Sequence, residues 1–119
     1  MDFTFDNNIP IYIQLLEYLK IYLISGVFKS GDKLPSVRDF ANTFKVNPNT
    51  MQKALSELED MKLIYTERTN GKFVTKDQKL IEKLKDEYAL TLAKSYFDGM
   101  KKIGLGKADS IKYLERISD

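Results

Sequence analysis

Two helix start signals follow each other closely in residues 35–50, and no other feature of the chain constrains its fold as strongly. Ser36 can cap a helix, and Asp39 follows three residues later, which is the spacing of a capping box. Asn47 can cap a second helix, with Pro48 at the first helical position, where a helix tolerates proline best. These signals predict two short helices joined by a tight turn, over about 36–44 and 48–61.

The second of these helices begins with a row of small polar side chains. Asn49, Thr50, Gln52 and Lys53 place amides, a hydroxyl and an amine at its N-terminal end. Such groups suit the major groove of DNA, because Asn and Gln can pair with adenine and a recognition helix contacts base edges with its first turns. The local pattern alone also fits an ordinary helical hairpin with a solvated polar face.

Apolar residues recur at helical spacing in both helices and in an earlier segment. A first helix is expected from about Pro10 to Ser25, and Gly26 is a natural stop for it. We interpret the apolar stripes as core. Their members are Ile11, Leu15, Tyr18, Leu19, Tyr22 and Leu23, then Val37, Phe40, Ala41 and Phe44, then Met51, Ala54, Leu55 and Leu58.

Two runs of β-forming residues come next, over 63–68 and 72–75, on either side of Thr69-Asn70-Gly71. An Asn-Gly pair between such runs is a hairpin signal. A hairpin placed directly after a helix-turn-helix is a wing. The predicted fold class is therefore mainly α with a small β wing, and residues 1–76 are expected to form a winged helix-turn-helix domain.

Residues 77–119 are expected to form a short two-helix unit that dimerises. A long helix is predicted over about 77–102 and a short one over about 107–118, with two glycines between them. Two helices alone cannot cover both of their apolar faces, so association with a second copy is the simplest solution. The expected interface stripe is Leu84, Tyr88, Leu92 and Tyr96. Four aromatic residues could instead line a cavity for a small-molecule effector, although interface core is favoured: Tyr88, Tyr96, Phe97 and Tyr113.

Composition narrows the classes of function. The net charge is only +2, and residues 1–76 carry ten Lys/Arg against nine Asp/Glu. If the partner is a nucleic acid, the basic side chains must therefore lie on one face, and a dimer must double the number of these side chains. The chain has no histidine and no cysteine, which excludes disulfides, Cys/His zinc sites and imidazole or thiolate catalysis. No metal or cofactor is expected. A cysteine-free chain with an acidic N-terminus and no long apolar run predicts a cytoplasmic protein without a signal peptide or membrane span.

Taken together, these motifs resemble the GntR family of bacterial transcription regulators. The matching segments, in the order in which the family has them, are Pro10–Gln14, Gly26–Arg38, Val46–Thr50, Leu58-Glu59 and Gly71–Val74. The short C-terminal part is similar to that of the YtrA-like subfamily. That similarity implies a homodimer joined through the C-terminal helices, and often a gene beside an ABC transporter operon. The resemblance implies a regulator that binds double-stranded operator DNA, with a repressor favoured over an activator.

Position by position, the resemblance also implies which residues contact DNA. Arg38 matches an arginine that contacts DNA from the helix before the recognition helix, and Gly71 falls at the wing tip, near the minor groove. The full set expected at DNA is Ser36, Arg38, Asn47, Asn49, Thr50, Gln52, Lys53, Gly71 and Lys72.

The chain departs from the family at Thr69, where a wing glycine is lost, and at Lys62, where the recognition helix usually ends on glycine. If Lys62 has left-handed backbone, its steric cost is about 1 kcal/mol.

Two other classes of function remain open at this point. A winged helix can serve only as a protein-interaction module, although the polar helix start and Arg38 argue against that use. A small enzyme would have to rely on carboxylates, lysine, serine or tyrosine, and the sequence shows no convergent cluster of these.

Overall fold

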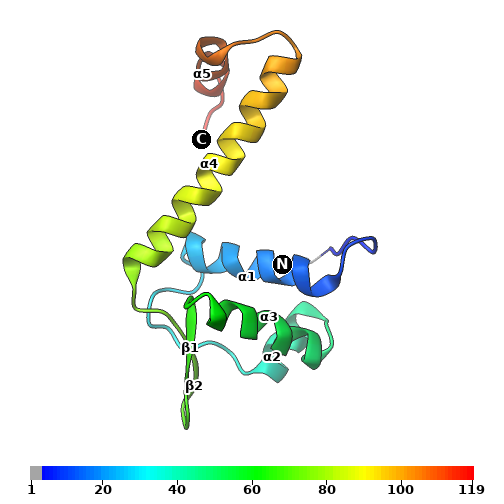
Figure 1. The fold of residues 1–119 in the computed structure, drawn as a ribbon, viewed down its shortest axis with the longest axis vertical. Coiled ribbons are helices and arrows are strands. Elements are labelled where there is room, and N and C mark those ends of the chain that lie inside the picture. The colour runs from blue at the N-terminus through cyan, green and yellow to red at the C-terminus, as the bar shows by residue number, and fades with distance from the viewer. Residues whose placement is uncertain (1–3) are drawn as a thin grey trace. The chain divides into compact units, whose positions relative to one another are not determined.

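The computed structural model describes residues 4–119, which form five helices and two strands (Figure 1). Along the chain these are α1 (Ile11–Ser25), α2 (Val37–Phe44), α3 (Pro48–Asp60), β1 (Ile64–Glu67), β2 (Gly71–Val74), α4 (Gln78–Lys102) and α5 (Lys107–Glu115). Three helices followed by a hairpin confirm the predicted winged helix-turn-helix. The chain divides into two compact units, which we call the N-terminal unit, up to Glu82, and the C-terminal unit, Lys83–Asp119. The domain boundary expected at residue 76 stays a prediction.

The start signals of α2 and α3 act as the sequence predicts. Ser36 Oγ accepts a hydrogen bond from the backbone N–H of Asp39 at 3.1 Å, which is one half of the expected capping box. Asn47 Oδ1 accepts from the backbone N–H of Asn49 at 2.7 Å, and Pro48 is the first residue of α3. Each cap satisfies a backbone donor that the first turn of a helix leaves unpaired.

Both helices end on a lysine in left-handed backbone. Lys45 follows α2 with φ 58°, and Lys62 lies just beyond α3 with φ 67°. After α3, the N–H of Leu63 donates to the carbonyl of Leu58, which gives the helix a Schellman ending. Glycine adopts this conformation without steric conflict, so Lys62 carries a cost of about 1 kcal/mol. The left-handed backbone considered for Lys62 from the sequence is therefore present.

The core of the N-terminal unit lies among α1, α2, α3 and the inner face of the hairpin. Its buried apolar residues are Leu15, Leu16, Leu19, Leu23, Leu34, Phe40, Ala41, Phe44, Met51, Ala54, Leu55, Leu58, Leu63, Ile64 and Val74. Most of the predicted stripes are confirmed, while Tyr18, Tyr22 and Val37 are half-buried. Ile11 was wrongly assigned to the core, because it begins α1 and is 44% exposed. Leu16 was missed.

Aromatic rings pack α1 against α2. The Tyr22 ring centre lies 5.8 Å from those of Phe28 and Phe44, and Phe40 lies 5.9 Å from Phe44. Burial, and to a smaller extent Tyr18, raises the pKa of the Tyr22 phenol above its usual value. This packing holds α2, and through it the turn before α3, in a fixed place.

The hairpin is antiparallel, with Tyr65 opposite Phe73 and Glu67 opposite Gly71. The sequence predicts a turn at Thr69-Asn70-Gly71, but the loop is one residue earlier. The N–H of Asn70 donates to the Glu67 carbonyl at 3.2 Å, and Gly71, with φ 102°, already begins β2. Glycine is needed there because the backbone is left-handed at the point where the strand resumes.

The C-terminal unit pairs the end of α4 with α5. The Tyr96 hydroxyl donates to the backbone carbonyl of Ser110 at 2.8 Å, and Ser110 Oγ donates to the carbonyl of Gly106 at 2.8 Å. Of the described residues in the two helices, Ser110 is buried and none in α4 is. Helix α5 ends at Glu115, three residues before the predicted end.

Candidate nucleic-acid interface

The side of α3 that faces away from the core carries polar side chains. Asn49, Gln52, Lys53 and Ser56 are exposed, while the apolar residues that alternate with them at helical spacing are buried. The Gln52 side-chain amide donates to Ser56 Oγ at 3.2 Å, one turn further along. Thr50, also expected at DNA, is half-buried on the flank of this face. The first two turns of α3 thus present hydrogen-bonding groups of the kind that read base edges.

Charge is distributed unevenly along α3. Its only basic residue is Lys53, whose ammonium lies 3.7 Å from the ring centre of Tyr12 in α1. The C-terminal half carries Glu57, Glu59 and Asp60. Phosphates repel these carboxylates, so only the N-terminal half of the helix is electrostatically suited to lie close to a DNA backbone.

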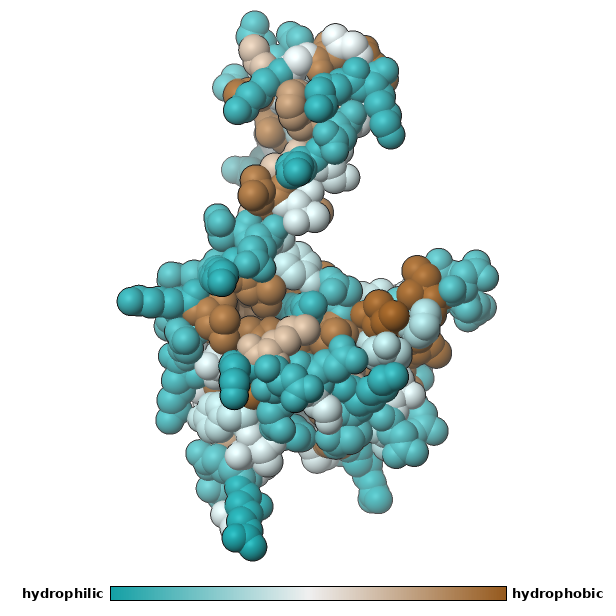
Figure 2. Space-filling view, viewed as in Figure 1, coloured by the Kyte–Doolittle hydropathy of each residue, from teal (hydrophilic) through white to brown (hydrophobic). Residues whose placement is uncertain are grey.

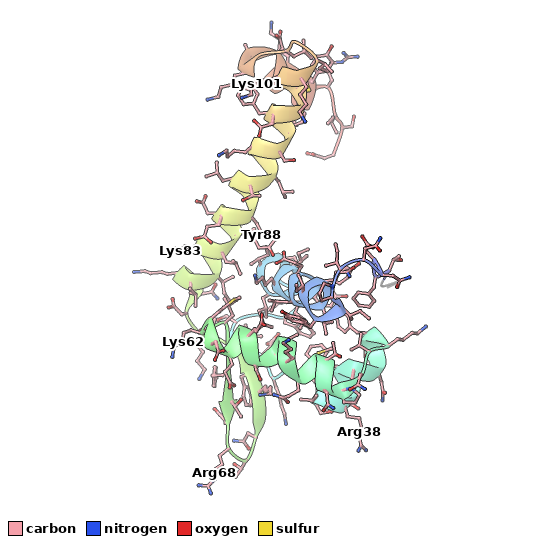
Figure 3. All side chains as sticks on the ribbon, turned by 45° about the vertical axis from the view of Figure 1, so that its right-hand side comes forward. Arg38, Lys62, Arg68, Lys83, Tyr88 and Lys101 are labelled. Carbon is pink, nitrogen blue, oxygen red and sulfur yellow. The ribbon has the colours of Figure 1, made fainter. Side chains whose placement is uncertain are left out.

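Two arginines lie on the same side of the N-terminal unit. In Figure 3, Arg38 of α2 and Arg68 at the hairpin tip both point toward the lower side of this unit. Both are exposed. The residues expected at DNA from the sequence included Arg38 but not Arg68. A basic residue in the loop of a predicted wing is the sequence signal that would have indicated Arg68. The surface of the hairpin and of the adjoining part of this unit is mostly hydrophilic (Figure 2).

The two capping residues are partly used within the protein. Ser36 Oγ and Asn47 Oδ1 each accept a hydrogen bond from the backbone of their own helix. A hydroxyl and an amide also carry donor groups, which can reach phosphate oxygens at the start of a helix. Their contact with DNA stays a prediction.

Lys72 lies in a cluster that joins β2 to α3. Its ammonium lies 3.0 Å from Thr66 Oγ1 and 3.7 Å from Glu59 Oε1, and its side chain is only 17% exposed. The Thr66 hydroxyl in turn donates to Glu59. The Lys72 amine is thus engaged inside the protein, an arrangement that the sequence does not reveal, and its contact with DNA stays a prediction.

The C-terminal unit exposes large apolar side chains (Figure 2). The most exposed are Leu90, Leu92, Ile103 and Ile117, at 61%, 68%, 71% and 69%. Of the stripe expected at a dimer interface, Leu92 is exposed, whereas Leu84, Tyr88 and Tyr96 are half-buried. A groove of about 290 Å³ lies between α4 and α5 and is lined by residues that include Leu90, Phe97, Ile111 and Leu114.

The described residues show no grouping of His, Cys, Asp or Glu side chains that could hold a metal ion. Within residues 4–119, no helix combines the length and the apolar character that a membrane span requires.

Comparison with known proteins agrees with this geometry. The family described as "Bacterial regulatory proteins, gntR family" matches residues 11–74. The uncharacterized HTH-type transcriptional regulator YhcF of Bacillus subtilis is 33% identical over 119 residues, which cover 100% of this chain and 98% of that protein. The HTH-type transcriptional repressor YtrA of Bacillus subtilis is 41% identical over 73 residues, 61% of this chain and 56% of that one. A solved structure, a GntR family transcriptional regulator from Listeria monocytogenes, is 38% identical, with a TM-score of 0.87 over 96% of this chain and 100% of that chain.

Proposed function

This chain belongs to the gntR family of bacterial regulatory proteins, and from that premise we propose that it is a homodimeric, sequence-specific repressor of transcription. Members of the family are DNA-binding transcriptional regulators and not enzymes. The name of YtrA describes that protein as a repressor, which supports the same role here. The similarity to YtrA also supports membership of the YtrA-like subfamily and, with it, an operon for a transporter as the target.

The observation that carries this proposal is the exposed polar start of α3. Asn49 and Gln52 stand there on a helix whose position is fixed by its cap and its buried face. In the major groove their amides can donate to and accept from the edge of adenine. Arg38, one helix earlier, would bind phosphate and set the register of α3 on the duplex.

Dimerisation is supported by the apolar surface of the C-terminal unit. Exposed side chains such as Leu92 and Ile103 are costly in water, and a second copy would cover them. A twofold dimer would also present two α3 helices, and its operator would have two half-sites about one helical turn apart. We expect any small-molecule effector to bind in the groove between α4 and α5, which Tyr96 and Phe97 line, whereas Tyr88 and Tyr113 do not.

Binding of the purified chain to the DNA upstream of its own gene tests this function. We expect fluorescence anisotropy to show a dissociation constant at least about 10³-fold lower for that DNA than for a shuffled duplex of equal length and composition. Equal affinity for the two duplexes would point to a non-specific DNA binder, and no binding to either would favour the protein-interaction alternative.

A further inference from the structure

Lys33 lies beside the wing although it precedes the hairpin by some thirty residues in the sequence. Its backbone pairs with Phe73 of β2. On either side, the N–H of Leu34 donates to the carbonyl of Lys72 at 2.8 Å, and the carbonyl of Asp32 accepts from the N–H of Val74 at 2.9 Å. The segment 32–34 therefore lies along the free edge of β2, and the backbone of Lys33 is held there by the hydrogen bonds of its neighbours.

The Lys33 side chain lies on the outer face of the hairpin. Directly paired residues on neighbouring strands point to the same face, and this rule places Lys33, Phe73 and Tyr65 together. The rings of Tyr65 and Phe73 stack there, with centres 5.6 Å apart. The opposite face carries the buried Ile64 and Val74.

The side chain of Lys33 also runs toward the hairpin tip. Its Cε would lie 3.5 Å from a β carbon placed on Gly71, the residue that begins β2 after the loop. Lys33 is exposed, and its ammonium has no hydrogen bond or ion pair with any residue in the part of the chain that the structure describes. An ammonium without an ion pair among the described residues thus lies next to the wing tip, on the face that also carries Glu67.

The surroundings of Lys72 are the opposite of those of Lys33. Lys72 lies on the inner face, where its ammonium contacts Thr66 and Glu59 and its side chain is only 17% exposed. To reach a phosphate, this ammonium would have to leave both partners. The contacts of Glu59 with β1 and β2 also join the acidic end of α3 to the wing.

We propose that Lys33 is the wing lysine that binds a DNA phosphate, and that Glu59, Thr66 and Lys72 position the wing against α3. This inference rests on the proposed DNA-binding function. It assigns to Lys33 the role that the sequence pattern suggests for Lys72. The wing would then hold DNA through Arg68 at its tip and through Lys33 beside Gly71.

The salt dependence of DNA binding separates these roles. The full chain is titrated with a mixed-sequence duplex over a range of salt concentrations, because phosphate binding does not depend on sequence. Lys33→Ala should make the slope of log K against log[salt] shallower by about 0.9 for each phosphate that is no longer neutralised, counted over the protomers bound. Lys33→Arg should restore the slope. Lys85→Ala, an exposed lysine of α4, serves as the matched control and should leave the slope unchanged.

The positioning role is tested in the same titration and by thermal melting. Lys72→Ala and Glu59→Gln should lower the midpoint of unfolding and weaken binding while keeping the slope of the parent chain, whereas Lys33→Ala should leave the midpoint unchanged. A normal slope for Lys33→Ala, or a slope that falls for Lys72→Ala, would overturn the assignment. If the parent chain itself shows no salt-dependent binding, the proposed function fails, and not only this inference.

Discussion

The backbone N–H of Leu63 donates to the carbonyl of Leu58 at 3.0 Å, and this bond closes α3 around Lys62 in left-handed backbone. In most helices that end this way the residue at the Lys62 position is glycine. Here α3 ends correctly without glycine, because the hydrogen bonds of the ending outweigh a local steric cost. That cost is small enough to measure by substitution.

Lys62→Gly should stabilise the N-terminal unit by about 0.5–1 kcal/mol, because glycine has no steric conflict in left-handed backbone. The greater freedom of glycine in the unfolded chain cancels part of this gain. Urea denaturation of both proteins gives the difference in unfolding free energy. Lys85→Gly, inside α4, is the control and should destabilise by about 1 kcal/mol. A clear loss of stability in Lys62→Gly would show that the lysine side chain itself supports the end of α3.

Gln52→Ala should weaken binding to the cognate site by about 1–3 kcal/mol if Gln52 makes a bidentate contact with a base. Preference should relax at one position in each half-site, because only the base opposite Gln52 is left without its partner. Competition binding against a set of singly substituted operators measures both effects. Unchanged affinity together with an unchanged preference would remove Gln52 from the set of base-reading residues.

Arg38→Ala should weaken binding to cognate and random DNA to the same extent, because binding to a phosphate carries no sequence information. The salt slope should shrink by about 0.9 for each phosphate that the guanidinium no longer neutralises, counted over both protomers. Anisotropy titrations on the two DNAs at several salt concentrations provide the comparison. A loss confined to the cognate site would instead make Arg38 a base-reading residue.

Leu92→Glu should prevent dimerisation without unfolding the chain, because this side chain is 68% exposed in the single chain and a buried carboxylate in an apolar interface is strongly unfavourable. Sedimentation velocity at micromolar concentration measures the association state. Ile9→Glu, which alters another exposed apolar residue (43%) in the N-terminal unit, should remain dimeric. A parent chain that sediments as a monomer at this concentration would contradict the proposed dimer.

Features that depend on neighbours in the sequence were predictable. Ser36 and Asn47 cap the expected helices because a cap needs only the backbone two or three residues later. The buried faces of α2 and α3 follow from helical spacing, since one side of each helix must be covered. Ile11 has the same helical spacing but is exposed, because spacing alone does not show how far along α1 the other helices cover it.

Contacts between distant segments were not predictable in the same way. The cluster of Glu59, Thr66 and Lys72 forms only when the hairpin folds against α3, and Lys33 reaches the wing only because the segment after α1 pairs with β2. From the sequence, Lys72 of the predicted wing was expected at DNA and Lys33 was not, because Lys33 lies some thirty residues before the hairpin. Their different surroundings, one exposed and one enclosed, come from the tertiary structure.

The most direct test of the central claim is selection of bound duplexes from a random-sequence DNA pool by the full chain, followed by sequencing. Two polar helix starts related by a twofold axis should enrich one roughly palindromic motif, with half-site centres about one helical turn, or about 10 base pairs, apart. Absence of an enriched motif, or enrichment of a single unpaired half-site, would contradict a homodimer that reads DNA through α3.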